Sequence, residues 1–482
     1  MTNSAESQDA YRAVMQHAVD LLCKHVTARP YSGKTPAELA EFFQGEVLTE
    51  GGLGADAIRE RLHSVVANSV MLTHPNTAAH LHCPPLIAAL AAEAVISALN
   101  QSMDSFDQAP AATMLEERMV DWLKRELGFP GVGGGIFTAG GTQSNYMALL
   151  LARDGCLEQR WQWNAQTRGL PNEARRLRIL CSDVSHFTVE KSAAQLGLGT
   201  DSVIRVATDA GFRMNADALG AALEELRRRD LVPMTVVATA GTTDFGSIDP
   251  LAEIAVMARE AGAWFHVDAA YGSALLFSAK HRSLLHGIDL ADSVSMDFHK
   301  LFWQPISCAA LLLRDAKNFR HIELHADYLN PELHDELGIP NLVTRSLATT
   351  RRFDALKLWV SSQSLGRKRL GEMIDATLDL AAHAAEIMRK DSRLELIHQP
   401  TIGCVVFRYQ PASPEVGANA LNARLRQSLF EKGIAVIGHT VVRGQQCLKF
   451  TFMNPMVTKQ QVEELVHAVT DCGERLEQSI TT

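Results

Sequence analysis

The chain has 482 residues, of which 46% are hydrophobic and 21% charged, a composition that excludes a globally disordered protein. Its formal net charge is −9, from 46 basic and 55 acidic residues, so it lacks the basic excess of a general nucleic-acid-binding surface. No apolar run is long enough to span a membrane and the first residues lack a signal-peptide core, so we expect a cytoplasmic protein.

The first hundred residues have a mostly helical pattern. Ala10–His25 is amphipathic, and Pro85–Asn100 is rich in Ala, Leu and Ile at helical spacing. We therefore predict an N-terminal helical segment over residues 1–100.

Residues 101–365 alternate short apolar runs with helical stretches. Helices are expected over Ala216–Arg229 and Leu251–Ala261. The apolar runs are Ile179–Cys181, Val203–Val206, Thr235–Ala238, Trp264–Val267, Ser293–Met296 and Ala309–Leu313. Strands that alternate with crossover helices predict a large α/β domain with a mostly parallel sheet that is covered on both faces.

The C-terminal part, residues 366–482, has shorter and more antiparallel-like elements. A long helical stretch over residues 356–387 leads into it. Four short strands are expected after this stretch, over residues 394–398, 405–409, 435–438 and 448–452. We interpret this part as a small α+β domain.

Chemistry-bearing residues first appear in the sequence Thr138-Ala-Gly-Gly-Thr-Gln-Ser-Asn145, directly before a helical stretch. Gly140 and Gly141 allow a tight turn, and we expect Thr142 to cap the helix. The N–H groups and the dipole of a helix start favour an anion such as phosphate. Taken alone, this pattern is more often a simple cap.

Three further side chains follow predicted strands. Asp268 ends an apolar strand, and the small residues after it leave room for a flat ring. Lys300 lies between apolar runs, where its amine needs a partner or a lowered pKa. His186 follows another strand and could lie over a ligand ring. A helix cap, a lysine that extends to the surface and a core histidine are the alternatives.

One cofactor, pyridoxal 5'-phosphate (PLP), accounts for all these features together. Its phosphate needs a helix start, its pyridinium nitrogen an anion and its aldehyde a lysine. The chain here resembles the group II PLP-dependent amino-acid decarboxylases, whose signature runs from Ser293 through Lys300, Cys308 and Leu311 to Arg314. The segment Thr239-Ala-Gly-Thr-Thr243 upstream also agrees.

The resemblance implies PLP fold-type I and a homodimer with active sites at the subunit interface. Lys300 would hold the cofactor as a Schiff base, Asp268 would pair with the pyridinium nitrogen, and His186 would stack on the ring and touch the substrate. These three would be the catalytic residues. The cofactor-binding residues it implies are Gly141, Thr142, His186, Thr243, Asp268, Ala270, Asp297, His299 and Lys300.

The substrate pocket of aromatic members of the family corresponds to two segments here. The first holds His80, His82 and Cys83, and the second holds Asp104 where those enzymes carry Phe. A buried acid is costly without a cation, which a distal ammonium of the substrate would supply. The residue pattern of these segments most resembles that of the diaminobutyrate and siderophore-associated lysine decarboxylase branch of the family. We predict a diamino acid, with 2,4-diaminobutyrate first and lysine or ornithine next.

One departure from the family pattern concerns proton donation. Aromatic-amino-acid decarboxylases protonate the α-carbon with a loop tyrosine, and that position falls on Leu342 here. His186, Tyr328 or a histidine of a partner subunit are alternative donors. The alternatives to amine formation are an oxidative reaction that gives an aldehyde, or decarboxylation of an aromatic or acidic amino acid.

Metal chemistry is not indicated by the sequence. The eight cysteines form no C-x-x-C pair, so neither a disulfide framework nor a zinc ribbon is predicted. His80 and His82 lack the nearby acidic or thiolate ligands that a metal site would need. We therefore predict no metal site.

Overall fold

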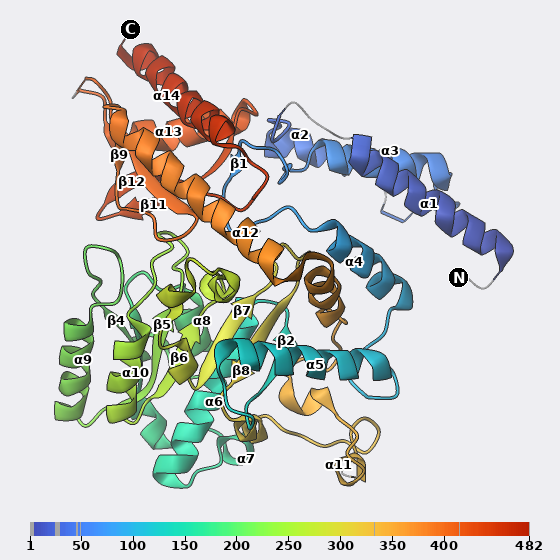
Figure 1. Cartoon of the computed structure of the whole chain (residues 1–482), viewed down its shortest axis with the longest axis vertical. Helices are drawn as coiled ribbons and strands as arrows, with labels where there is room; N and C mark the ends of the chain where they lie inside the picture. The colour runs from blue at the N-terminus through green and yellow to red at the C-terminus, as the bar shows by residue number, and fades with distance from the viewer. Residues whose placement is uncertain are drawn as a thin grey trace. The chain divides into compact units, whose positions relative to one another are not determined.

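The computed structural model describes residues 4–24, 29–44, 47–48, 50–331, 333–413 and 415–481, which form two compact units (Figure 1). The central unit comprises Leu81–Ala382 and His398–Cys404. The terminal unit comprises the described residues of Met1–His80, His383–Ile397 and Val405–Thr482. Among the described residues, no helix is both long and apolar enough to cross a membrane.

A seven-stranded sheet forms the core of the central unit. In sheet order its strands are β2 (Gly134–Thr138), β8 (Ala309–Leu313), β7 (Ser293–Asp297), β6 (Trp264–Asp268), β5 (Val232–Thr239), β3 (Leu177–Ser182) and β4 (Val203–Val206). The strands from β7 to β4 pair in parallel, and β8 is antiparallel to both of its neighbours. The predicted, mostly parallel sheet is confirmed. Because β2 is also antiparallel to β8, its carboxyl end lies at the same edge as those of the parallel strands.

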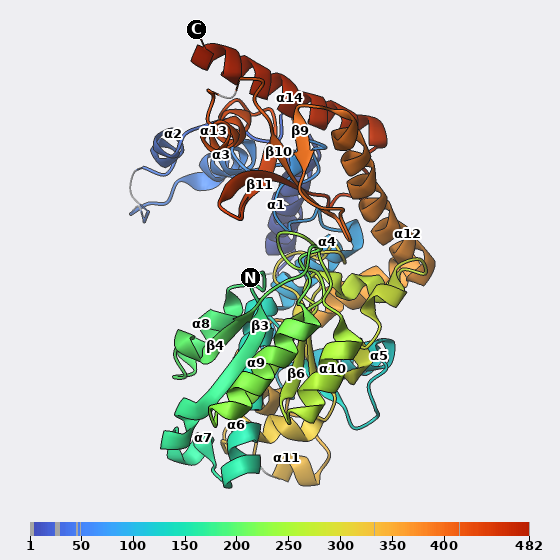
Figure 2. The same cartoon turned by 90° about the vertical axis from the view of Figure 1, so that its left-hand side faces the viewer.

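The strands are buried because helices cover the sheet. Every residue of β2, β7 and β8 is buried, as expected for strands with packed layers on both faces. Helix α6 contacts β2 and β5 to β8, whereas α9 and α10 contact strands β4 to β6 (Figure 2). The helices of this unit are α4 (Ile87–Leu99), α5 (Pro110–Leu127), α6 (Gly141–Trp161), α7 (Ala165–Arg168), α8 (Thr188–Gln195), α9 (Ala216–Arg228), α10 (Leu251–Glu260) and α11 (Leu333–Glu336).

The long predicted helix after residue 355 is present as α12 (Ala355–Lys390), which runs from the central unit into the terminal unit. Gly366 interrupts its helical geometry with a φ of 68°. That left-handed conformation is one that glycine adopts at little cost.

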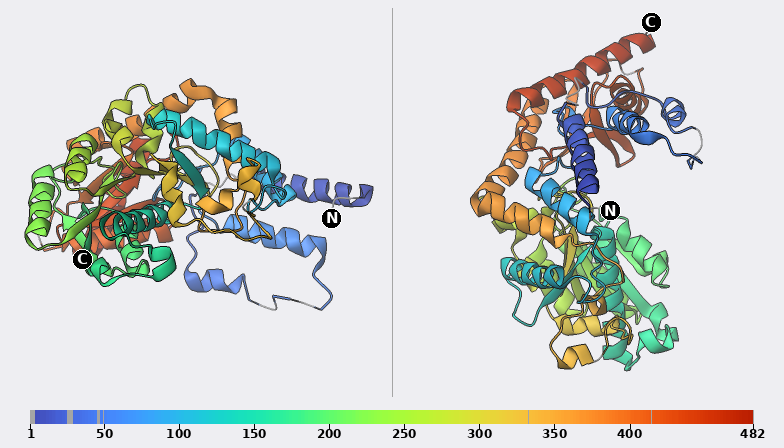
Figure 3. Two further views of the ribbon diagram at one scale, coloured as in Figure 1. Left: turned by 90° about the horizontal axis from the view of Figure 1, so that it is seen from below. Right: turned by 90° about the vertical axis from the view of Figure 1, so that its right-hand side faces the viewer.

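The terminal unit contains a five-stranded sheet of mixed direction. Its order is β1 (Thr77–Ala78), β11 (Val436–Val442), β12 (Gln445–Thr451), β10 (Cys404–Tyr409) and β9 (Leu394–Leu396). Its helices are α1 (Ala5–Lys24), α2 (Pro36–Glu41), α3 (Gly54–Ala67), α13 (Ala418–Glu431) and α14 (Lys459–Thr481). Helix α1 contacts α3, and α13 contacts α14 (Figure 3). The pairs β11–β12 and β9–β10 are antiparallel, and β1 is parallel to β11.

The two ends of the chain share this small sheet. Thr77 and Ala78 pair with Val436 and Ile437, and Asn76 Nδ2 donates to the carbonyl of Ile434 over 2.9 Å. The described residues up to His80 group with C-terminal segments, while Leu81–Ala382 group with the large sheet. The division into 1–100, 101–365 and 366–482 stays a prediction about domain boundaries.

Candidate active site

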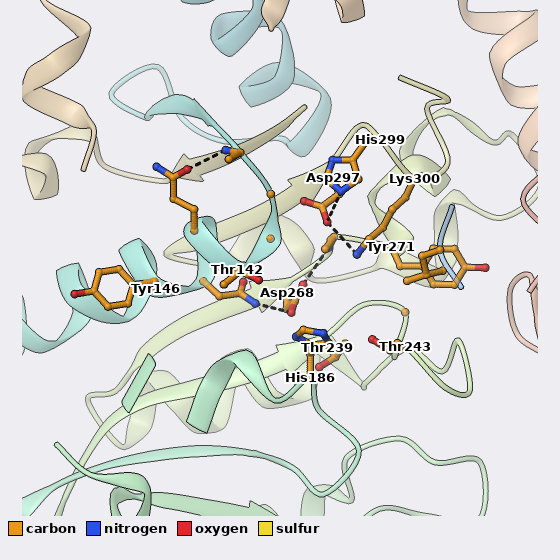
Figure 4. A pocket seen from close by; sticks show the side chains of 18 of the residues that line it. Thr142, Tyr146, His186, Thr239, Thr243, Asp268, Tyr271, Asp297, His299 and Lys300 are labelled. Atoms are coloured by element: carbon orange, nitrogen blue, oxygen red, sulfur yellow. Dashed lines mark hydrogen bonds and ion pairs between the residues drawn. The ribbon is translucent and has the colours of Figure 1, made fainter. Parts of the chain in front are cut away.

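A cavity of about 800 Å³ lies at the carboxyl edge of the large sheet (Figure 4). Its walls come from the turn between β2 and α6 and from the residues that end or follow β3, β5, β6 and β7. All nine residues predicted to contact a cofactor are among its lining residues: Gly141, Thr142, His186, Thr243, Asp268, Ala270, Asp297, His299 and Lys300. The topology brings them together because the carboxyl ends of parallel strands meet at one edge.

The start of α6 differs from its prediction in one respect. Gly140 occupies the N-cap position and Thr142 lies in the first turn, so the prediction that Thr142 caps the helix is wrong. The chain enters the helix two residues earlier than predicted, and Gln143 Oε1 accepts the N–H of Ala139 over 2.9 Å. The Thr142 side chain lines the cavity instead.

Gly141 is at a position where the backbone passes very close to other elements. A Cβ atom there would lie 3.2 Å from Ala270 Cβ and 3.3 Å from Asp297 Oδ2. Such a contact is tighter than a side chain normally makes. Glycine therefore keeps the helix start, with its N–H groups that lack intrahelical acceptors, accessible to an anion in the cavity.

Lys300 is held by a carboxylate from the preceding strand. Its Nζ lies 2.9 Å from Asp297 Oδ2, and His299 Nε2 lies 3.6 Å from the same oxygen. The other oxygen, Asp297 Oδ1, is buried and has no hydrogen-bond partner among the described residues. Burial lowers the pKa of His299, so its imidazole is neutral at neutral pH. The turn thus presents an amine, an imidazole and an oxygen with unused hydrogen-bonding capacity.

Asp268 ends β6 in a nearly closed environment. Asn145 Nδ2 donates to its Oδ2 over 2.7 Å, and the Ala270 N–H donates to its Oδ1 over 3.1 Å. Burial alone would raise the pKa of this carboxyl, but the positive charge of Lys300 and these hydrogen bonds outweigh it, so the pKa is below its ordinary value. Asp268 is therefore an ionised carboxylate at neutral pH, suited to a protonated ring nitrogen.

His186 lies near Asp268 on the adjoining part of the edge (Figure 4). Its Nδ1 is 3.0 Å from Thr188 Oγ1. Burial is the largest influence on its pKa and lowers it, although the charge of Asp268 acts in the opposite direction. The ring is therefore neutral at neutral pH and can face a flat ligand.

The predicted substrate-pocket residues do not belong to this lining, which contains Leu81 from the same stretch of chain. His80 is in the terminal unit, whereas His82, Cys83 and Asp104 are in the central unit. Cys83 Sγ donates to the carbonyl of His299 over 3.3 Å, and burial raises the pKa of this thiol to about 12. Asp104 Oδ1 is buried without a hydrogen-bond partner in the described part of the chain. Their role in substrate binding stays a prediction.

The side chains considered as proton donors, and the Leu342 position, differ in whether they line the cavity. Leu342 is a buried hydrocarbon side chain, 3% exposed, at the start of a short 3₁₀ helix. Tyr328 is 90% exposed and is not among the residues that line the cavity. Of the named candidates, only His186 lines the cavity formed by one chain.

Sequence reasoning missed the polar residues that surround Asp268. Asn145 and His266 are buried and joined by a hydrogen bond of 3.0 Å, and Asn145 bonds to Asp268. The signal was present in the sequence. Asn145 follows Thr142 by about one helical turn, and His266 precedes Asp268 by two residues in an otherwise apolar strand, hence on the same face.

Comparison with known proteins identifies the family. The model of the pyridoxal-dependent decarboxylase conserved domain matches residues 45–410. The chain is 39% identical to an L-2,4-diaminobutyrate decarboxylase of Acinetobacter baumannii, covering 100% of this chain and 96% of the relative. It is 42% identical to one of Rhizobium meliloti (strain 1021), over 98% and 94% of the two chains.

A solved structure shows the same architecture. It is the glutamate decarboxylase domain of diaminobutyrate-pyruvate transaminase and L-2,4-diaminobutyrate decarboxylase from Vibrio parahaemolyticus, with a TM-score of 0.90 and 39% identity over 98% of this chain and 97% of that chain. Both the family model and the fold agree with the strand-edge cavity that holds a lysine, a carboxylate and a helix start. The chain therefore belongs to the pyridoxal-dependent decarboxylase family and is a PLP-dependent amino-acid decarboxylase.

Proposed function

We propose that this enzyme removes the α-carboxyl group of a diamino acid and releases the amine. The substrate that we place first is 2,4-diaminobutyrate, with lysine or ornithine next. The observation that carries this choice is the 39% and 42% identity, over nearly whole chains, to two L-2,4-diaminobutyrate decarboxylases.

The residues of the cavity fit PLP. The volume of about 800 Å³ is within the range of cofactor sites. When bound, PLP supplies the electron withdrawal that lets the α-carbon lose carbon dioxide. Lys300 is the amine that would hold the cofactor aldehyde, and Asp268 is the anion that would keep its ring nitrogen protonated. The narrow gap at Gly141, which a Cβ would fill, supports a phosphate position at the start of α6.

His186 is our candidate for the proton donor to the substrate α-carbon. It lines the same cavity as Lys300, and histidine is the side chain that most often transfers protons in active sites. Leu342 has no proton to give, and Tyr328 lies outside the lining of the cavity. A histidine of a partner subunit is the remaining alternative.

Substrate selection would depend on Asp104. Its buried Oδ1 has no partner among the described residues, and an unpaired buried carboxylate oxygen is unfavourable unless a cation or donor reaches it. The distal ammonium of a diamino acid would be such a partner. Because Asp104 does not line the cavity of its own chain, we propose that it serves the site of a partner subunit.

We therefore propose a cytoplasmic homodimer. Exposed apolar side chains support the assembly: α1 has no buried residue, and Val14, Val19 and Leu22 on it are 49–59% exposed. On α4, Ile87 is 85% exposed. Pairing of two chains would remove such surface from water. Sedimentation of the purified enzyme at several concentrations tests the assembly, and a monomer with full activity would contradict it.

The decisive experiment is a substrate panel with carbon dioxide release as the readout. Diaminobutyrate, ornithine, lysine, glutamate, tyrosine and histidine would be compared by kcat/KM. We expect the highest value for diaminobutyrate, followed by the other two diamino acids. A preference for glutamate or tyrosine would refute the proposed substrate class and favour an acidic or aromatic amino acid.

The hydrocarbon side chain at Leu342 favours one second function, an oxidative reaction. Without rapid protonation of the α-carbon, dioxygen could accept two electrons and form hydrogen peroxide, and water would then release an aldehyde and ammonia. Product analysis separates the two outcomes. Amine without peroxide supports simple decarboxylation, whereas equimolar aldehyde and peroxide would refute it.

A further inference from the structure

Polar side chains follow one face of two adjacent strands next to Asp268. They are residues 264, 266 and 268 on β6 and residues 293 and 295 on β7, with His266 opposite Ser293 and Asp268 opposite Ser295. Because successive side chains of a strand point to opposite faces, the two-residue spacing places these groups on the same face. Asn145 of α6 bonds to groups on that face.

These side chains form a continuous series of hydrogen bonds, which we call the relay. The indole Nε1–H of Trp264 donates to Ser293 Oγ over 2.8 Å, and this oxygen lies 2.8 Å from His266 Nδ1. His266 Nε2 is 3.0 Å from Asn145 Oδ1. At the other end of the same amide, Asn145 Nδ2 donates to Asp268 Oδ2 over 2.7 Å. His266 and Ser293 are fully buried, so water does not compete for these bonds.

The chemistry of its two ends gives the relay a single direction. An indole N–H can only donate, and an ionised carboxylate can only accept. Asn145 must therefore turn its NH₂ group to Asp268, which directs its carbonyl to His266 and requires a proton on Nε2 of that ring. Burial lowers the pKa of His266 to about 4. The ring is neutral at neutral pH, and its Nδ1 accepts from the Ser293 hydroxyl.

Asn145 also connects Asp268 with His186. Its Nδ2 donates to Thr188 Oγ1 over 3.1 Å, and this oxygen lies 3.0 Å from His186 Nδ1. Because the threonine oxygen accepts from the amide, its own proton is available to His186 Nδ1. Neutral His186 then carries its proton on Nε2. One amide therefore orients both a carboxylate and an imidazole of the cavity.

We propose that Asn145, His266 and Ser293 are positioning residues that keep Asp268 ionised and aligned with the ring nitrogen of the cofactor. The proposal rests on the proposed role of Asp268. The charge that most favours ionised Asp268 is that of Lys300, whose amine must exchange partners in every turnover. The hydrogen bond from Asn145 does not depend on that exchange, so the relay holds the carboxylate throughout the reaction.

The test measures the protonation state of the ring nitrogen in the holoenzyme. The readout is the NMR chemical shift of the isotope-labelled ring nitrogen of bound PLP. We expect His266→Leu to move this signal toward that of an unprotonated nitrogen and to lower kcat by about tenfold, the order of magnitude expected when one partner of a buried hydrogen bond is removed. His266→Gln retains a donor toward Asn145 and an acceptor toward Ser293, so it should keep most of the wild-type signal.

Ser293 and Ser273 provide a matched control pair. Both serines are fully buried, but the Ser273 hydroxyl has no hydrogen-bond partner among the described residues, whereas that of Ser293 belongs to the relay. We expect Ser293→Ala to move the ring-nitrogen signal in the same direction as His266→Leu and Ser273→Ala to leave it unchanged. If circular dichroism shows that His266→Leu does not fold, the comparison of these two serine variants tests the relay on its own.

Two different failures can be told apart. A wild-type signal in folded His266→Leu and in Ser293→Ala, or equal shifts in both serine variants, would overturn the relay. An unprotonated ring nitrogen in the wild-type holoenzyme would instead overturn the proposed pairing of Asp268 with the cofactor.

Discussion

The cavity at the sheet edge and the segments predicted to select the substrate differ in how much of a site one chain completes. The cavity contains all nine predicted cofactor residues, each at or near a strand end or a helix start. The segments around residues 80–83 and 104 contribute only Leu81 to its lining. A carboxylate oxygen of Asp104 is buried without a partner, whereas both oxygens of Asp268 are hydrogen-bonded.

This difference separates two tasks. Cofactor chemistry needs a fixed geometry, and a buried parallel sheet supplies it because its strand ends cannot move independently. Substrate choice depends on groups outside that rigid edge, which a second chain or the substrate itself must complete. Substitutions at the edge should therefore impair cofactor binding and turnover together, and substitutions at Asp104 should change substrate preference alone.

The largest effect is expected for Lys300→Ala. Removal of the only amine among the residues that line the cavity should abolish measurable turnover and the visible absorbance of the lysine-bound cofactor. Absorption spectra and carbon dioxide release check both outcomes. Lys368→Ala, at a side chain that is 93% exposed, is the control and should behave as the wild type. Residual turnover at a tenth of the wild-type rate would contradict the role of Lys300.

A smaller loss is expected for Asp268→Asn. The substitution preserves shape but removes the negative charge that would stabilise a protonated ring nitrogen, so kcat should fall by about a hundredfold or more, as for loss of a preorganised electrostatic group. Cofactor affinity, measured by absorbance titration of the apoenzyme, should fall as well. Unchanged kcat with an intact spectrum would show that the edge carboxylate is not part of the chemistry.

The buried side of the edge gives a pH prediction. The folded-state pKa of His266 is about 4, below its ordinary value of 6.5, so the unfolded chain binds this proton more readily. Its contribution to stability is present above pH 6.5 and is lost as pH falls toward 4. His266→Gln has no imidazole to titrate, so it does not lose this contribution. When pH falls from 7.5 to 5, the unfolding free energy of the variant should therefore rise by about 2 kcal/mol relative to that of the wild type, from 1.4 kcal/mol per pKa unit.

Urea unfolding of both proteins at the two pH values measures this gain. The comparison with the variant is needed because Asp249 acts in the opposite direction. Burial raises the pKa of Asp249 to about 6, so the folded state takes up that proton first and gains stability as pH falls through this value. A constant difference between wild type and His266→Gln would mean that His266 titrates normally in the folded protein.

The smallest effect on the enzyme is expected for Asp104→Asn. Loss of one carboxylate charge toward the distal ammonium should raise KM for diaminobutyrate by about tenfold and leave cofactor affinity unchanged. Asp107→Asn is the matched control, because Asp107 is exposed and already accepts from Ser105 Oγ over 2.5 Å. Equal KM changes in the two variants would remove Asp104 from substrate selection.

The order of the elements was readable from the sequence, because apolar runs and helical periodicity are local properties. Strands β3 to β8 lie where short apolar runs alternate with helical stretches. The strand-end positions of Asp268, Lys300 and His186 followed from the same pattern. The mistaken cap at Thr142 shows the limit, since an N-cap depends on the backbone conformation of Gly140, which residue types alone do not fix.

The sequence by itself determined the kind of sheet and pointed to the cofactor through Asp268, Lys300 and the predicted helix start, because these follow from residue type and spacing along the chain. The full set of cofactor residues came from the resemblance of its motifs to a known family. Only the tertiary structure decided that Thr77 and Ala78 join the sheet of the C-terminal part. It also joined Asn145, His266 and Ser293 into one relay behind Asp268. The small sheet and the relay both join residues that lie more than a hundred residues apart or on neighbouring strands. Such contacts depend on strand order and register, which the local periodicity of the sequence does not specify.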